Sequence, residues 1–231
     1  MAGRLEDVES EMIRYYAARA GEYDDWYLRR GRYSHGPTTD AAWHSDLGAA
    51  AAWLAGRGFH GRIVELAAGT GWWSPVLAAQ GQLTLCDAAP EPLEKARVRL
   101  AAAGLAARFQ IRDAWSEPDT SADCLFAGFW LSHVDRGRLD EFLGLVARWL
   151  VPDGLFAFID SRRDPESGAL DHRPPVDDVQ VRRLDDGTSF RVRKVFYEPA
   201  DLESALDRAG FRQIEVIATD RFFVLGSARR Y

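Results

Sequence analysis

The sequence predicts one α/β domain built on a seven-stranded, mostly parallel sheet whose last strand is antiparallel. Two observations support this fold class. Between residues 62 and 160, short apolar runs alternate with segments of helical length, as βαβ units require. Farther along, the apolar runs 214–218 and 222–225 lie so close together that only a turn, not a crossover helix, can join them.

The composition fits a globular protein and excludes several function classes. The 231 residues are 47% hydrophobic and 28% charged, which suits one sizeable domain with a large core. The formal net charge of -6 argues against a nucleic-acid partner, because phosphate binding requires a basic surface. No apolar run is long enough to span a membrane, and residues 1–10 are too polar for a signal peptide. We therefore expect a cytoplasmic protein, monomeric or homodimeric, without a membrane partner.

The two cysteines, Cys86 and Cys124, lie in apolar runs. This placement is typical of buried free thiols in a cytosolic protein. Two cysteines cannot hold a cluster that needs three, so iron–sulfur chemistry of that kind is excluded.

The first 60 residues are expected to form a helical lid. Residues 5–20 place apolar side chains at helical spacing, and Gly31, Gly36 and Pro37 then indicate a loop. Asp40 is a candidate N-cap for a helix that runs to residue 55. Clustered tyrosines indicate either core packing or a lid whose hydroxyls reach a pocket; they are Tyr15, Tyr16, Tyr23, Tyr27 and Tyr33.

A strand, a glycine turn and a second strand form the centre of the chain. Residues 62–66 are a strand, and the small-residue turn 67–71 follows it. Residues 72–79 fit a short helix, and a second strand, 83–86, ends on Asp87. This order is that of a βαβ unit whose turn faces a small ligand.

The remaining elements continue the alternation and then depart from it. Helices are expected at 90–103, 138–150 and 199–209, and further strands at 109–111, 122–129 and 155–159. Residues 164–178 are rich in Pro and Asp, which indicates a surface loop. Residues 179–184 and 189–196 alternate apolar with basic side chains around a turn signal, which predicts an inserted β-hairpin. Its basic residues could cap a pocket or form a dimer surface, but by default we expect them to face solvent.

Four stretches at successive strand ends resemble the class I S-adenosylmethionine-dependent methyltransferases, whose fold is Rossmann-like. The stretches are residues 65–71, Asp87, residues 113–115 and residues 129–133. The resemblance covers about residues 62–225, and residues 16–27 resemble the lid helix of the small-molecule members. It implies a single domain whose parts are an N-terminal lid (1–60), a cofactor-binding core (61–160), a loop and hairpin insertion (161–198) and a closing helix with strands (199–231).

The resemblance implies S-adenosylmethionine as the cofactor. Gly69 and Gly71 would let it lie on bare backbone, Glu65 would meet its ammonium group, and Asp87 would accept both ribose hydroxyls. Otherwise, Glu65 is a surface or helix-capping acid and Asp87 is an N-cap. The family pattern has glycine in place of Ala67, although alanine still lets a ligand approach the backbone. The expected cofactor-binding residues are Tyr16, Tyr23, Glu65, Ala67, Gly69, Gly71, Asp87, Ala88, Asp113, Ala114, Trp115 and Phe129.

Adenine and the sulfonium would be met at the ends of the third and fourth strands. By resemblance, Asp113 meets the adenine amino group and the backbone N–H of Ala114 meets a ring nitrogen. Trp115 either stacks on adenine or packs in the core. Phe129 and Trp130 would form an aromatic wall that attracts the sulfonium.

The acceptor is expected to be a small molecule, with O-methylation slightly favoured over N-methylation. His133 either acts as the general base that a hydroxyl acceptor needs or orders the turn after the fourth strand. Asp160 and Arg162 either bind a polar acceptor or form a surface ion pair. The expected acceptor-binding residues are Tyr27, Trp130, His133, Asp160 and Arg162.

Rival chemistries lack their motifs. A nicotinamide dehydrogenase needs a third glycine in the turn, where this chain has Trp72-Trp73-Ser74. A metal-dependent methyltransferase needs clustered acids at the ends of strands four and five, but strand four ends in Phe129-Trp130, so we expect no metal. The alternative function is a protein that binds S-adenosylmethionine without transferring methyl, as a scaffold or a non-methylating catalyst.

Overall fold

The computed structural model describes residues 2–231, with side chains from residue 8 onward, so the side chains of residues 5–7 lie outside the described part. The main sheet has the strand order β3-β2-β1-β4-β5-β9-β8. Its strands are β1 (Arg62–Leu66), β2 (Gln82–Asp87), β3 (Arg108–Ile111), β4 (Ala122–Gly128), β5 (Leu150–Ser161), β8 (Phe211–Ala218) and β9 (Phe223–Arg230). The first five pair in parallel, and β9 runs antiparallel to both of its neighbours. The predicted fold class is confirmed.

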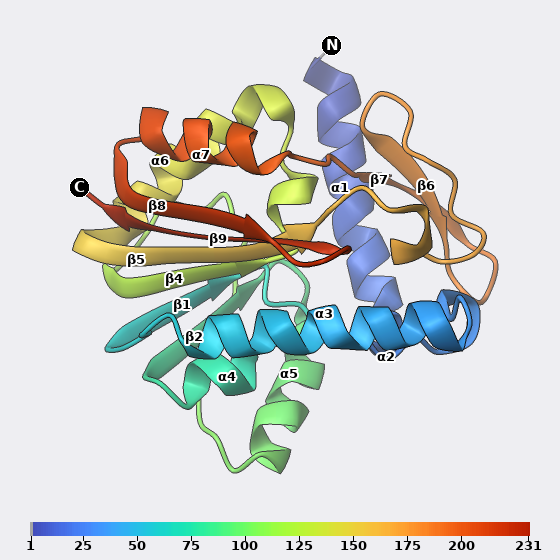
Figure 1. Cartoon of the computed structure of the whole chain (residues 1–231), viewed down its shortest axis with the longest axis horizontal. Helices are drawn as coiled ribbons and strands as arrows, with labels where there is room; N and C mark the ends of the chain where they lie inside the picture. The colour runs from blue at the N-terminus through green and yellow to red at the C-terminus, as the bar shows by residue number, and fades with distance from the viewer. Residues whose placement is uncertain (1) are drawn as a thin grey trace.

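Helices cover both faces of this sheet (Figure 1). One face carries α3 (Pro37–Ala55), α4 (Ser74–Ala78) and α5 (Pro90–Ala102), and the other carries α6 (Leu139–Trp149) and α7 (Pro199–Arg208). Because successive strand residues point to opposite faces, β1 supplies both cores. Ile63 packs in the core under α3, while Val64 and Leu66 pack in the core under α6.

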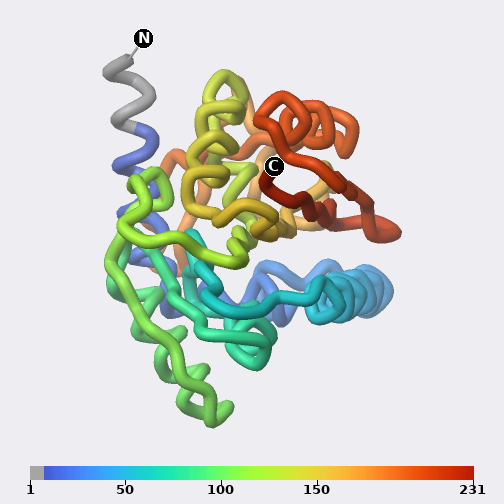
Figure 2. The backbone as a smooth tube through the Cα atoms, turned by 90° about the vertical axis from the view of Figure 1, so that its left-hand side faces the viewer, coloured from blue at the N-terminus to red at the C-terminus, as the bar shows by residue number. Residues whose placement is uncertain are grey.

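The N-terminal helices and the hairpin lie together at one end of the sheet. These elements are α1 (Ala2–Arg19), α2 (Asp24–Leu28), β6 (Val179–Arg183) and β7 (Ser189–Arg193). Figure 1 shows α1 beside the hairpin, and Figure 2 shows α1 at the side of the layered core. Met12 and Tyr15 of α1 pack with Leu184 and Val192 of the hairpin in a separate apolar cluster. Segments far apart in sequence therefore meet over the strand ends.

Several predicted boundaries are wrong. The helix α3 begins at Pro37, not at residue 40, because Gly36 turns the chain with a φ of 92° and proline suits the first helical position. Asp40 does not cap this helix; its carboxylate accepts hydrogen bonds from the Ser34 hydroxyl (2.5 Å) and the His35 backbone N–H (3.0 Å). β5 begins at Leu150, inside the segment predicted as helix and turn.

Candidate active site

The turn after β1 is held by one carboxylate from the next strand. Ala67, Gly69 and Gly71 have positive φ angles of 49°, 55° and 70°. Asp87, the last residue of β2, accepts hydrogen bonds from the backbone N–H groups of Gly69 (2.8 Å) and Ala89 (3.0 Å). Burial raises the pKa of Asp87, while those two donors favour its ionised form. The carboxylate thus fixes the turn against the end of the second strand.

Ala67 adopts a backbone conformation that favours glycine, at the position where the family pattern has glycine. A left-handed conformation costs a residue with a Cβ about 1–2 kcal/mol. The chain therefore keeps the glycine-type turn with a strained alanine.

A cavity opens over this turn and the neighbouring strand ends; we call it the strand-end cavity. It brings together most of the residues that the sequence assigned to the cofactor, namely Tyr16, Tyr23, Ala67, Gly69, Asp87, Ala88, Asp113, Ala114, Trp115 and Phe129. Trp130, assigned to the acceptor, lines the same cavity. Helix α1 adds Glu9, Met12 and Ile13, which no motif indicated, because a lid helix carries no motif of its own.

Glu65 and Gly71, also assigned to the cofactor, lie outside the residues that line this cavity. Glu65 is buried beneath the turn and accepts a hydrogen bond from the Ser74 hydroxyl (2.5 Å). Burial raises the pKa of Glu65 to about 8, so its carboxyl is largely protonated at neutral pH. At Gly71 an added Cβ would come within 2.7 Å of the Cβ of Ala96, so this glycine allows α5 to pack closely.

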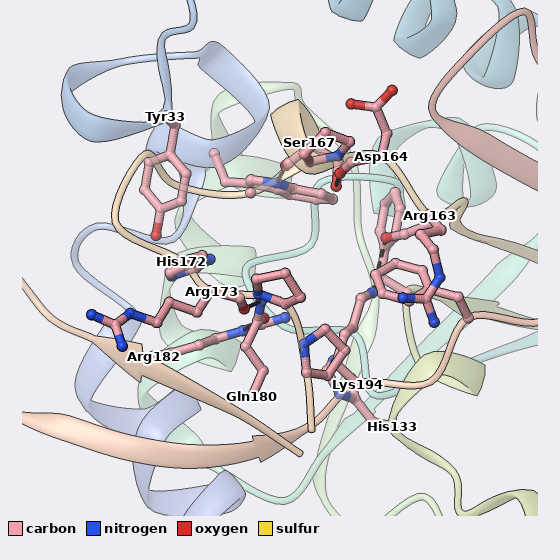
Figure 3. A pocket seen from close by; sticks show the side chains of 18 of the residues that line it. Tyr33, His133, Arg163, Asp164, Ser167, His172, Arg173, Gln180, Arg182 and Lys194 are labelled. Atoms are coloured by element: carbon pink, nitrogen blue, oxygen red, sulfur yellow. Dashed lines mark hydrogen bonds between the residues drawn. The ribbon is translucent and has the colours of Figure 1, made fainter. Parts of the chain in front are cut away.

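A second cavity of about 310 Å³ lies between α1, the hairpin and the loop after β5; we call it the basic cavity (Figure 3). Its aromatic wall includes Trp26, Tyr33 and Phe196. Its positively charged residues are Arg19, Arg163, Arg173, Arg182 and Lys194. The hairpin therefore caps a cavity, and the expectation that its basic residues all face solvent is wrong.

Four residues line both cavities: Tyr16, Tyr23, Phe129 and His133. Phe129 adopts a positive φ of 56°, and its backbone N–H donates to the carbonyl of Ile159 at the end of β5 (2.6 Å). The two cavities therefore adjoin at the end of β4, with this aromatic group as their common wall.

His133 is buried at this common wall and is engaged through both ring nitrogens. Its Nδ1 lies 2.6 Å from the Arg193 carbonyl, which can only accept, so Nδ1 carries the hydrogen. The Tyr16 hydroxyl then donates to Nε2 (2.7 Å) and accepts from the Arg182 guanidinium (3.1 Å). Burial, and then the charges of Lys194 and Arg182, hold the pKa of His133 well below its usual range. The imidazole is neutral, and its one lone pair is already occupied.

Lys194 reaches the basic cavity from the end of the hairpin. Its ammonium donates to the hydroxyls of Ser132 (2.9 Å) and Ser161 (3.0 Å) and lies 3.8 Å from the Asp160 carboxylate. Asp160 is itself buried and accepts from the backbone N–H groups of Ser132 (2.8 Å) and Ser161 (2.7 Å). Asp160 therefore joins the ends of β4 and β5 and supports Lys194 from behind rather than lining the cavity.

Tyr27 and Arg162, expected at the acceptor, also lie outside both cavities. Tyr27 is buried and stacks on Trp72, with ring centroids 4.2 Å apart. The Arg162 guanidinium donates to the backbone carbonyls of Thr219 (3.0 Å) and Asp220 (3.3 Å), which turns it toward β8 and β9. Tyr27 thus packs in the core, and Arg162 holds a turn.

The residues of the strand-end cavity suit S-adenosylmethionine. Asp87 and Asp113 supply carboxylates at the ends of β2 and β3, where ribose hydroxyls and an adenine amino group would need acceptors. Phe129 and Trp130 supply aromatic faces for a sulfonium. Within the described part of the chain, no group of three or more His, Cys, Asp or Glu side chains converges as a metal site. No helix in that part is both long and apolar enough to cross a membrane.

Comparisons with known proteins agree with this fold. A family model described as a methyltransferase domain matches residues 63–154. A complex of DhpI with SAM and HEP is 29% identical, covering 96% of this chain and 98% of DhpI, with a TM-score of 0.77. A DhpI–SAH complex is also 29% identical, covering 97% and 98%, with a TM-score of 0.76.

A more distant structure shares the fold. The 1,6-didemethyltoxoflavin-N1-methyltransferase of Burkholderia thailandensis is 16% identical, covering 96% of this chain and 88% of that enzyme, with a TM-score of 0.60. A search of curated proteins found no match. The methyltransferase-domain match, the fold and the similarity over 98% of DhpI all agree with a class I S-adenosylmethionine-dependent methyltransferase.

Proposed function

We propose that the protein transfers methyl from S-adenosylmethionine to a small-molecule acceptor, and that the acceptor atom is oxygen rather than nitrogen. The observation that carries this proposal is the common wall of Tyr16, Tyr23, Phe129 and His133, which lines both cavities. Because these four residues line both cavities, the cavities adjoin there. A methyl group carried in the strand-end cavity would face an acceptor in the basic cavity at this point. The volume of about 310 Å³ falls within the range of small-molecule sites.

The cofactor supplies an already activated methyl group, so the task of the protein is alignment. We assign Asp87 to the ribose hydroxyls, and Asp113 and the backbone of Ala114 to adenine. Phe129 and Trp130 would orient the sulfonium toward the basic cavity. DhpI supports a site for two ligands, because one of its complexes holds HEP in addition to SAM.

The charge of the basic cavity favours an oxygen acceptor. A free amine is protonated at neutral pH, and a cation would be repelled by the arginines and Lys194 around it. Oxygen acceptors carry no such charge.

Two measurements test the proposal. Calorimetry should show saturable binding of S-adenosylmethionine, and absence of binding at millimolar ligand would refute it. A panel of small oxygen and nitrogen compounds should then yield S-adenosylhomocysteine with an oxygen compound. Binding of the cofactor without product from any member of the panel would favour a protein that binds without transferring methyl.

A further inference from the structure

The basic cavity carries a charge excess that its own residues do not neutralise. Five cationic side chains line it, and Asp164 is the one acid among its described lining residues. Of the five, Lys194 is paired with Asp160, which lies behind it at 3.8 Å. Asp164 is already paired with Arg221, whose Nε and Nη2 atoms lie 2.7 and 3.2 Å from its carboxylate oxygens. This excess stands in a chain with a net charge of -6, so it does not simply follow the composition.

The two most buried of these arginines have neutral partners. Arg19 is 4% exposed, donates to the Tyr33 hydroxyl (3.0 Å), and has no hydrogen-bond partner for its buried Nε. Arg182 is 9% exposed and donates to Tyr16 (3.1 Å) and to the side-chain oxygen of Gln180 (3.0 Å). Among the residues that the structure describes, neither forms an ion pair. A buried cation without a counter-charge is strongly unfavourable, which favours a negatively charged ligand.

His172 adds a neutral donor to the same cavity. Its Nδ1 accepts from the backbone N–H of Ala169 (3.3 Å), so Nε2 carries the hydrogen, and that buried atom has no partner. Burial, followed by the charge of Arg182, lowers the pKa of His172, which keeps the ring neutral. The unpaired donors, Arg19 Nε and His172 Nε2, favour a ligand rich in oxygen acceptors.

The buried cations also lie against the wall that the two cavities share. Arg182 bonds to the Tyr16 hydroxyl, and the Arg19 guanidinium lies 4.6 Å from the ring centre of Tyr23. An anionic group held by these arginines would therefore lie beside Tyr16 and Tyr23, where the two cavities adjoin, and not at the far end of the basic cavity.

We propose that the methyl acceptor is a small organic oxyanion, namely a carboxylate, phosphate or phosphonate, and that one of its ionised oxygens takes the methyl group. This inference rests on the methyl transfer proposed above. A lone pair of the oxyanion forms the new O–C bond while the C–S bond breaks, and the C–S electron pair stays on sulfur. The oxyanion and sulfonium charges cancel, so no proton moves. No base is needed, which agrees with a His133 whose lone pair is occupied.

The test is calorimetry on the protein saturated with S-adenosylhomocysteine. The probes are acetate, methyl phosphate and methylphosphonate, with methyl acetate, trimethyl phosphate and dimethyl methylphosphonate as their neutral esters. At least one anion should bind with a Kd below about 10 mM, and its ester at least about tenfold more weakly. The three anions distinguish carboxylate from phosphorus acids. If S-adenosylmethionine and S-adenosylhomocysteine bind but none of the three anions does, the inference fails while the proposed function stands. If S-adenosylmethionine itself does not bind, the proposed function fails.

Three variants tie the binding to the basic cavity. Arg182→Gln should lower the affinity for the anion that binds by about tenfold or more, because a charge-assisted hydrogen bond is lost. Arg173→Gln, at an exposed lining residue whose loss spares the core, should weaken it as well. Arg183→Gln, at the exposed neighbour of Arg182 that lines neither cavity, is the matched control and should change nothing. Equal effects of all three variants would overturn the assignment to this cavity.

Product analysis tests the acceptor atom. The anion that binds, incubated with S-adenosylmethionine and the protein, should give its methyl ester and S-adenosylhomocysteine in equal amounts. Binding without ester formation, or a product methylated elsewhere with its oxyanion free, would overturn the assignment of that oxygen as the acceptor.

Discussion

Asp87 combines a structural role in the turn with a position on the strand-end cavity. Its carboxylate already holds the N–H groups of Gly69 and Ala89 and still lines the strand-end cavity. The sequence offered a ligand role and an N-cap as alternatives for this residue. The N-cap of α5 is Ala89, so the N-cap prediction is wrong, while the position of Asp87 on the cavity is compatible with a ligand role.

We expect Asp87→Ala to lower the affinity for S-adenosylmethionine by at least about tenfold, because hydrogen bonds to an ionised carboxylate are lost. Calorimetry measures the affinity, and circular dichroism checks that the fold survives. Glu94→Ala, at an exposed residue of α5, is the control and should bind normally. Unchanged affinity in Asp87→Ala would show that this acid does not bind the cofactor.

Glu65 is an acid whose pKa is raised on folding, from an ordinary value of 4.5 to about 8. The unfolded chain therefore releases its proton first, and stability present at low pH is lost as pH rises from 4.5 through about 8. Glu65→Gln keeps a hydrogen-bonding partner for Ser74 and should remove this loss. Urea unfolding at pH 5 and pH 8 should show the variant gaining stability over the wild type at the higher pH.

Glu65→Gln also tests the predicted contact between Glu65 and the ammonium group of S-adenosylmethionine. Because the carboxyl lies outside the strand-end cavity, we expect Glu65→Gln to change cofactor affinity by less than about threefold. A loss of tenfold or more would restore the carboxylate as the partner of that group.

At the scale of elements, the hairpin shows where sequence periodicity is informative and where it is not. Alternation correctly predicted β6 and β7, but we also expected the basic residues of the hairpin to face solvent. In β6 the structure shows the opposite, because Val181 is 61% exposed and Arg182 is 9% exposed, whereas in β7 Val192 is buried. Cross-strand partners share a face, so Arg182 lies on the same face as Phe190 and the buried Val192. The inward face is therefore mixed, and period-two alternation does not say which of its residues meet a polar cavity.

The Tyr16 hydroxyl of helix α1 contacts two residues of the site, His133 and Arg182. Tyr16→Phe would leave His133 Nε2 without its donor and remove the Tyr16 acceptor from Arg182. We expect a loss of about 1–3 kcal/mol in the free energy of unfolding, measured with urea. Tyr231→Phe, at a residue that is 85% exposed, is the matched control. Equal stability of the two variants would show that this hydroxyl contributes nothing to docking the helix.

At the scale of the whole molecule, the sheet and the strand-end cavity could be predicted because they depend on local signals. Apolar runs and glycine turns stand in the sequence beside the residues that they position, as Asp87 stands at the end of its strand. The basic cavity could not be predicted in this way. Arg19, His172 and Arg182 come from three separate segments, and only tertiary packing brings them together.

The acid side of the stability curve depends on histidines that folding keeps neutral. The pKa values of His133 and His172 are lowered, so the unfolded chain binds more protons once pH falls below about 6.5. Their contribution is complete above that pH and is lost on acidification. Relative to His172→Gln, the wild type should lose stability between pH 7 and pH 5 in urea unfolding. Parallel curves for the two proteins would contradict this.

The charge excess of the basic cavity also bears on turnover. Under the proposed reaction the acceptor enters with a negative charge and leaves as an ester with one charge fewer, while the arginines stay as they were. The interactions that hold the substrate are thus weakened by the chemical step itself. Product release is therefore driven by the loss of the feature that was recognised on entry, and product inhibition by the ester should be slight.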